Sequence, residues 1–364
     1  MAKNMILQEA PAMLHAYPPF YKPFRCTASA CPDNCCVGWE VVVDDDTAKL
    51  YSSIPGSLGD ALRGAMTVDA DGDRIIAMTD GHCPFWTQDH LCRVELELGH
   101  DAPCATCRKF PRLTQDYGVF TEYGLTLACP EAARLVLTQP GPWTFETEGE
   151  AGDPAEAEFD WDALADLIPL RQALMDILWR GDLTGRDALL QVLQQGQRCQ
   201  DLFDGEENIS LTDRPIHPLP TGDFKALLRF YLGLELLTED WKALLEDALD
   251  WAPTDKDWTR LTVVENDLLP RNLGAYYLSH YWFQAVADYD CLLKIQLLAA
   301  AWALTRCLCC HHLAKYGELP LDAQLRVQQL YAKEVEHDDV NRAALEDALV
   351  NNPAFSLENL ILLG

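Results

Sequence analysis

The chain has 364 residues, of which 28 are Lys or Arg and 57 are Asp or Glu, so its formal net charge is −29. This charge disfavours binding to nucleic acid or to anionic lipid, because both need basic surfaces. We therefore expect no nucleic-acid partner and no membrane partner. Hydrophobic residues make up 49% of the chain, which is enough for a large buried core.

The N-terminal residues lack the apolar stretch of a signal peptide, and the longest apolar run, residues 295–304, is about half of a membrane span. We therefore expect a cytoplasmic protein. Of the 14 cysteines, nine lie between Cys26 and Cys129. In the cytoplasm, such density is more typical of metal or redox chemistry than of disulfides.

Residues 1–145 are rich in turns, glycine and cysteine and predict a metal-binding domain of short strands and loops. Short strands are expected over 40–44 and 74–78, and short helices over 46–51 and 102–110. None of these segments has the apolar periodicity of a large core. A metal centre that ties the loops together would explain how such a region folds.

Residues 146–162 are acidic and contain glycine and proline, which predicts a linker or an exposed loop. Residues 163–364 predict a helical domain, because apolar residues recur at three- and four-residue intervals. The clearest helical patterns cover 161–178, 224–237, 241–249, 268–286, 292–308, 323–335 and 341–350, the last with Asp338 or Asp339 as N-cap. The expected fold class is α+β, mainly α, with a cysteine-rich N-terminal domain followed by an irregular C-terminal helical bundle.

The cysteines of the first domain occur in clusters with the spacing of ligands. The candidate metal ligands are Cys26, Cys31, Cys35, Cys36, Cys83, Cys92, Cys104, Cys107 and Cys129. Thiolates suit zinc and iron–sulfur centres, and the Cys-x-x-Cys clip formed by Cys104 and Cys107 occurs in both. Nine exceed the needs of one centre, so some of them have another role. A set of buried free thiols is the alternative interpretation.

The sequence leaves the identity of the metal open. Zinc would be satisfied by four ligands, and His82, His90 and His100 lie close to the cysteines. A 4Fe–4S cluster with four thiolates carries negative charge, which nearby basic residues would offset. These basic residues are Arg93, Arg108, Lys109 and Arg112. The charge argument favours an iron–sulfur cluster.

These motifs resemble the flagellin lysine-N-methylases, part of a wider group with a zinc- or iron-chelating cysteine domain. The matching pieces are Cys26, Cys31, Cys35-Cys36 with Trp39, Cys83-Pro84-Phe85, Leu91-Cys92, Cys107 with Pro111-Arg112, and Cys129-Pro130-Glu131-Ala132-Ala133-Arg134. The resemblance implies methyl transfer from S-adenosylmethionine to lysine side chains of flagellin or a similar protein, with a 4Fe–4S cluster in the cysteine domain. A stretch beginning at Glu265-Asn266 resembles the helical region of the family more weakly.

The chain shows neither a G-x-G-x-x-G fingerprint after a strand nor the Cys-x3-Cys-x2-Cys run of radical S-adenosylmethionine enzymes. A site for the methyl donor must therefore be built differently. For cofactor binding we name Arg108, Arg112 and Arg134.

Lysine is protonated at neutral pH, so a methylase needs a base or a desolvating pocket to free the amine lone pair. The candidate catalytic residues are Glu265, Tyr276 and Tyr277. Their alternative interpretation is ordinary core aromatics and a solvated carboxylate.

The run from Cys307 to His312 has the composition of a metal site but lies in a strong helical pattern. Here we expect a packed helix with buried thiols. Two other functions remain open at this stage: a non-catalytic zinc- or iron-chelating structural module, and an electron-transfer or redox-sensing protein.

Overall fold

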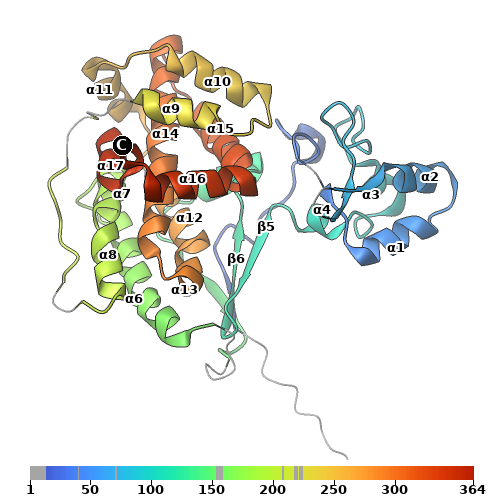
Figure 1. Cartoon of the computed structure of the whole chain (residues 1–364), viewed down its shortest axis with the longest axis horizontal. Coiled ribbons are helices and arrows are strands. Elements are labelled where there is room, and N and C mark those ends of the chain that lie inside the picture. Colours follow the sequence, from blue (N-terminus) through green and yellow to red (C-terminus); the bar gives the residue numbers. More distant parts are fainter. Residues whose placement is uncertain are drawn as a thin grey trace, which may run out of the picture.

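The computed structural model describes residues 14–39, 41–69, 72–152, 159–206, 209–216, 220 and 224–364. Helices hold 57% of these described residues and strands 10%, which confirms the expected class of α+β, mainly α. A large helical body and a smaller lobe stand beside each other (Figure 1). We call the smaller part, residues 35–110, the cysteine lobe.

The cysteine lobe has its own sheet and its own core. Its strands β2 (Val41–Val42), β4 (Arg74–Ile76) and β3 (Met66–Val68) are antiparallel, with Val41 opposite Ile76. Its helices are α1 (Asp45–Ser53), α2 (Gly56–Ala65), α3 (Arg93–Leu98) and α4 (Ala105–Lys109). The two expected strands and two expected helices are confirmed here, with shifted ends. The core is small and includes the thiol of Cys104.

A second sheet lies against the helical body and has the strand order β5-β6-β1-β7. Its strands are β5 (Arg112–Asp116), β6 (Phe120–Leu125), β1 (Leu14–Tyr17) and β7 (Glu146–Glu148). Strand β1 runs parallel to β6, with Leu14 opposite Phe120, and antiparallel to β7. Strand β7 lies in the segment that was expected to be a linker, and residues 153–158 of that segment lie outside the described residues. The division into domains stays a prediction.

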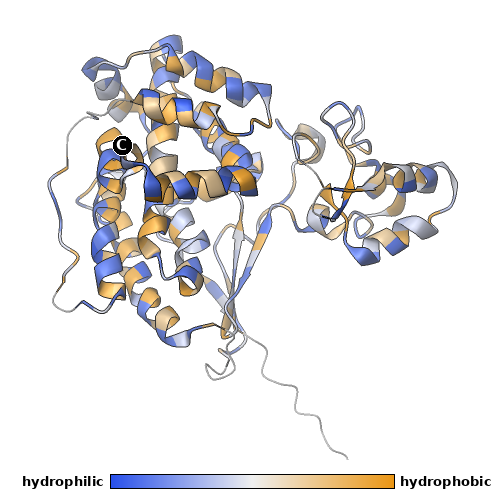
Figure 2. Cartoon of the chain, in the orientation of Figure 1, coloured by the Kyte–Doolittle hydropathy of each residue, from blue (hydrophilic) through white to orange (hydrophobic). Residues whose placement is uncertain are grey.

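The body is built from helices that pack around one apolar core. The longer ones are α5 (Pro130–Leu137), α6 (Trp161–Leu178), α7 (Gly185–Gln194), α8 (Gly196–Phe203), α9 (Phe224–Leu232), α10 (Glu239–Leu249), α11 (Asp255–Val264), α12 (Leu268–His280), α14 (Cys291–Tyr316), α15 (Leu321–Tyr331) and α16 (Asp339–Asn351). Short segments complete it: η1 (Ala28–Ala30), η3 (Trp282–Gln284), α13 (Ala285–Asp288), the π-helical turn η4 (Ala332–Glu336), η5 (Pro353–Phe355) and α17 (Leu357–Leu363). Most helices of the body carry both hydrophobic and hydrophilic residues (Figure 2), as the sequence periodicity predicts.

Helix α14 is the central element of the body. Its length and composition would suffice to cross a membrane, but 89% of its apolar window is buried inside the protein. Cys307, Cys309 and Cys310 are buried in this helix, and burial raises the pKa of each thiol. This confirms the expectation of a packed helix with buried thiols. Asp338 accepts a hydrogen bond from the Asn341 amide, so it is the N-cap of α16.

Candidate functional site

Six of the nine candidate cysteines gather in the cysteine lobe. They are Cys35, Cys36, Cys83, Cys92, Cys104 and Cys107. The amide of Cys83 donates to the carbonyl of Cys36 at 2.8 Å, and the sulfur atoms of Cys104 and Cys107 lie 3.5 Å apart. The thiols also interact electrostatically across these segments, Cys107 with Cys35 and Cys92, and Cys83 with Cys104. We call this set the six-thiol group.

Hydrogen bonds join five of these thiols, Cys36 with Cys35 and Cys83, and Cys104 with Cys107. The hydrogen bond from Cys36 lowers the pKa of Cys35 to about 7 and also lowers that of Cys83. In the same way, the hydrogen bond shared with Cys107 lowers the pKa of Cys104. Cys104 is the N-cap of α4, where backbone amides also favour a thiolate. Three thiols of the group, those of Cys35, Cys83 and Cys104, are therefore shifted toward the thiolate, the form that binds metal.

The other three candidates form a second set on the side of the helical body. Cys129 precedes α5 and interacts electrostatically with Cys26 and Cys31. Burial raises the pKa of Cys129 to about 12 and also raises that of Cys31. Cys129 and Cys31 are therefore protonated at neutral pH.

The donor set fits a soft metal or an iron–sulfur cluster in kind, because both bind thiolates. Within the described ranges, however, no three His, Cys, Asp or Glu side chains are placed to hold one ion. To bind a metal or a cluster, the thiols would therefore have to break the hydrogen bonds that they make with one another. The nearby histidines have other contacts: His82 stacks on Trp86 at 4.9 Å, and His100 pairs with Glu95 at 2.9 Å.

The three arginines named for cofactor binding contact different partners. Arg108 donates to the carbonyl of Asp101 at 3.1 Å, and Arg112 lies over the ring of Phe24 at 5.1 Å. Arg134 forms an exposed ion pair with Glu131 within α5. Their role in cofactor binding stays a prediction.

A pocket of about 180 Å³ lies at the seam between the cysteine lobe and the helical body. Its lining comprises Cys35, Trp39, Val41, Thr106, Cys107, Phe110 and His337. His337 is the only one of these that comes from the body, where it follows η4 and contacts the Thr126 hydroxyl. Desolvation of its ring against the body lowers the pKa of His337, so the ring is neutral at physiological pH. We call this the seam pocket.

A larger hollow of about 460 Å³ adjoins the seam pocket, and Trp39 lines both. Its charged residues include the buried Lys333, which pairs with Asp33 at 3.1 Å, and Arg326, which pairs with Asp33 at 2.9 Å. Burial alone would raise the pKa of Asp33, but Lys333, the Asn34 amide and Arg326 together outweigh burial and hold the pKa below its usual range. Asp33 thus ties the cysteine-rich segment to α15 and η4.

Tyr276 and Tyr277 meet at a buried carboxylate that the sequence analysis did not single out. Both hydroxyls donate to Glu336 at 2.7 Å, and Tyr281 donates at 3.0 Å. Burial raises the pKa of Glu336, although the three hydrogen bonds act in the opposite direction. Burial and the carboxylate raise the pKa of Tyr276 well above its ordinary value. The hydroxyls are therefore protonated donors at neutral pH.

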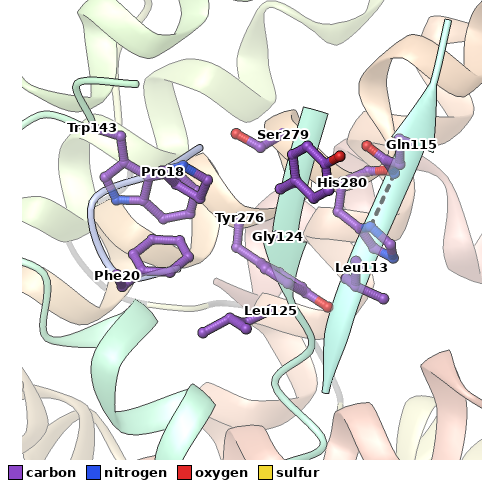
Figure 3. A pocket seen from close by; sticks show the side chains of 11 residues that line it. Pro18, Phe20, Leu113, Gln115, Gly124, Leu125, Trp143, Tyr276, Ser279 and His280 are labelled. Atoms are coloured by element: carbon purple, nitrogen blue, oxygen red, sulfur yellow. Dashed lines mark hydrogen bonds between the residues drawn. The ribbon is translucent and has the colours of Figure 1, made fainter. Parts of the chain in front are cut away.

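Tyr276 also borders a small hollow between the second sheet and α12 (Figure 3). Phe20, Trp143 and Ser279 stand around it, and Gln115 donates to the ring of His280 at 3.1 Å. Its volume of about 20 Å³ is that of a single water site, so it admits no substrate.

Glu265, the third candidate catalytic residue, lies elsewhere. Its carboxylate pairs with the guanidinium of Arg306 at 3.2 Å, and the Arg306 side chain is fully buried. The structure therefore brings Tyr276 and Tyr277 together but not Glu265 with them. Which residues are catalytic stays a prediction.

One sequence feature could have identified Glu336 and His337 as candidate functional residues. The run Lys333-Glu334-Val335-Glu336-His337 places four charged or titratable side chains in a helical pattern whose flanks are apolar. In the structure, Lys333 to Glu336 belong to the π-helical turn η4; Lys333 and Glu334 are buried, and Glu336 is half-buried. Such turns are frequent at functional sites.

The fold and the thiols define a mainly helical protein with an attached thiol-rich lobe, and the comparisons place it in a family. The family model described as the FliB lysine N-methylase C-terminal domain matches residues 187–363. The lysine-N-methylase of Salmonella choleraesuis (strain SC-B67) is 35% identical over 297 residues, which cover 76% of this chain and 66% of that protein. The lysine-N-methylase of Salmonella typhimurium (strain LT2) is 34% identical with the same coverage.

The flagellar biosynthetic protein FliU of Salmonella muenchen is 33% identical over 135 residues, which cover 34% of this chain and 76% of that protein. No solved structure matches the chain. The chain belongs to the FliB lysine N-methylase family. It spans slightly less than two thirds of the length of the two lysine-N-methylases that it matches.

Proposed function

We propose that this chain is a cytoplasmic, S-adenosylmethionine-dependent protein lysine N-methyltransferase that acts on flagellin or a similar protein. The observation that carries the proposal is the 35% identity to a lysine-N-methylase over 297 residues. The flagellar name of the relative FliU supports a flagellar substrate. The six-thiol group supports a 4Fe–4S cluster, with zinc as the alternative.

The reaction requires a neutral amine. The lone pair of the lysine nitrogen attacks the methyl carbon of the sulfonium, the carbon–sulfur bond breaks, and sulfur keeps the electron pair as a thioether. The nitrogen must lose one proton to a base or to water before or during this step.

The seam pocket has features that suit binding of the lysine side chain before the amine loses its proton. It is lined by aromatic side chains and by a neutral histidine next to the six-thiol group. The net charge of −29 also favours the approach of a cationic lysine side chain. A cluster bound by the six-thiol group would tie the loops of the lobe together beside this pocket.

The test is methyl transfer by the full chain, purified without oxygen. The protein is incubated with unmethylated flagellin and S-adenosylmethionine that carries a deuterated methyl group, and the flagellin peptides are analysed by mass. We expect labelled methyl groups on lysine side chains, and none when the methyl donor is left out. Unlabelled flagellin from a protein that retains its metal would overturn the proposal and favour a non-catalytic metal-binding module.

A further inference from the structure

Three aromatic rings line the seam pocket, and their planes are steeply inclined to one another. The ring centroids of Trp39 and Phe110 lie 5.5 Å apart, those of Trp39 and His337 lie 5.8 Å apart, and those of Phe110 and His337 lie 6.5 Å apart. All three pairs have interplanar angles between 63° and 65°. The rings therefore present their faces and edges around one small space rather than stacking into a closed core.

Such an arrangement recognises alkyl cations. An aromatic face attracts a cation that lies within about 6 Å of its centroid, and cages of several rings are used to bind quaternary and methylated ammonium groups. The protein already makes one contact of this kind here, because Nζ of Lys333 lies 5.3 Å from the centroid of the Trp39 ring. Lys333 lines only the larger hollow, so the seam pocket keeps its own aromatic walls.

The size of the pocket selects among cations. About 180 Å³ suits a single long side chain, whereas pockets for ligands of the size of S-adenosylmethionine run from about 300 Å³ upwards. Of the two hollows that share Trp39, only the larger one, of about 460 Å³, falls in that range. The sulfonium of the methyl donor is therefore a poorer fit to the seam pocket than a lysine ammonium.

We propose that Trp39, Phe110 and His337 form an aromatic cage that holds the side chain of the substrate lysine at the seam between the two parts of the protein. This inference rests on the proposed function, since it names the place where the methyl acceptor binds. The cage positions the amine next to Cys35 and Cys107, so the acceptor lies beside the six-thiol group. Each added methyl group leaves the product cationic or protonatable, so the cage also holds methylated lysine.

The test measures binding to the full chain by ligand-detected NMR, without any methyl transfer. The probes are the Nα-acetyl amides of lysine, trimethyllysine and norleucine, the last being the uncharged counterpart of lysine. From the strength of cation–π contacts we expect the two cationic probes to bind about three- to tenfold more tightly than norleucine. Equal binding of the three probes would overturn the cage.

Two substitutions of Trp39 test whether the cationic probes bind in the seam pocket. Trp39→Leu should abolish the preference for cationic probes, whereas Trp39→Phe should keep part of it. Trp86→Leu is the matched control, because Trp86 belongs to the same lobe but stacks on His82 outside the pocket. If Trp39→Leu fails to fold by circular dichroism, Phe110→Leu takes its place. A retained preference in a folded cage variant would overturn the assignment.

Competition with S-adenosylmethionine tests whether the cage binds the lysine ammonium or the sulfonium of the methyl donor. If the methyl donor displaces the lysine probe with the same sensitivity to Trp39→Leu, the cage holds the sulfonium and the lysine assignment is wrong. Binding of lysine by a wild-type chain that methylates no flagellin would leave the cage intact and overturn only the proposed function. Methyl transfer that is unchanged by Trp39→Leu would overturn the cage and leave the proposed function intact.

Discussion

At the scale of single residues, the most unusual feature is the carboxylate of Glu336, which lies inside the protein with three tyrosine hydroxyls as donors. The guanidinium of Arg342 lies 5.1 Å from the ring of Tyr281 and adds a positive charge nearby. Hydrogen bonds to a charged acceptor are stronger than those between neutral groups, and a buried charge is costly when it loses a partner. The cluster therefore fixes α12 to the turn η4 that precedes His337.

Replacing Tyr277 tests the strength of this cluster. Tyr277→Phe removes one hydroxyl donor from Glu336 and should lower the free energy of unfolding by about 1.5–3 kcal/mol. Chemical denaturation of the full chain measures this change. Tyr316→Phe is the control, because Tyr316 is 61% exposed and should change stability by less than about 0.5 kcal/mol. Equal effects of the two substitutions would contradict the role given to Glu336.

His280 predicts a pH dependence of stability. Burial lowers its pKa from 6.5 to about 3 in the folded protein, so the unfolded chain takes up the proton first as the pH falls. The stabilising effect of a neutral His280 is present above pH 6.5 and is lost as the pH falls toward 3. Between about pH 7.5 and about pH 5.5, this group alone should remove about 1.4 kcal/mol. His280→Gln should be less sensitive to acid by this amount in urea denaturation, and an unchanged pH profile would contradict the prediction.

The sequence predicts which residue types carry the chemistry but not how they group. All nine clustered cysteines are visible as a ligand pool, yet their division into sets of six and three depends on Cys129 entering the core of the body with α5. The contact of Trp39 with His337 joins residues from opposite ends of the chain. No local pattern encodes such a contact, because it arises only from the docking of the lobe on the body.

At the scale of elements, Asp44 joins two helices of the cysteine lobe. Its Oδ1 caps α1 by accepting from the Thr47 amide at 3.0 Å, and its Oδ2 accepts from the Ala105 amide at the start of α4 at 2.8 Å. The hydrogen bonds from these amides, that of Ala105 first, lower the pKa of Asp44 to about 2. The helix that carries the Cys104–Cys107 clip is thereby held to α1.

Loss of this link should loosen the lobe. Asp44→Ala should lower the stability of the protein by about 1–3 kcal/mol, since it removes a helix cap and one further acceptor for a backbone amide. Asp46→Ala is the control, because Asp46 lies in the same helix with a side chain that is 94% exposed. Thermal unfolding measures both. A control as unstable as the Asp44 variant would show that the effect belongs to the helix rather than to the link.

Helices were easier to predict than strands for a physical reason. Helices such as α6 and α14 extend over several turns, so their apolar residues repeat often enough to be recognised. Strands β1 and β7 have 4 and 3 residues and form only because β6 and β1 lie beside them. A segment this short carries no periodic signal of its own.

At the scale of the whole molecule, we expect metal binding to depend on the cysteine lobe. The wild-type chain purified without oxygen should contain about four irons and four sulfides and absorb visible light. Cys83→Ser should lower the iron content, because Cys83 belongs to the six-thiol group. Cys199→Ser is the control, since Cys199 is buried in α8 and its iron content should match that of the wild type. One zinc per chain without visible absorbance would contradict the cluster and support a zinc centre.

The most direct test of the central claim is the methylation state of flagellin from cells with and without this chain. A strain that lacks any lysine methylase of this family would express its flagellin alone, with the wild-type chain, or with the Cys83→Ser variant. Peptide mass mapping would then count methylated lysines. We predict methyl-lysine only in cells with the wild-type chain. Flagellin that is unmethylated in all three strains, or methylated to the same extent in all three, would contradict the claim that this chain is a flagellin lysine methylase.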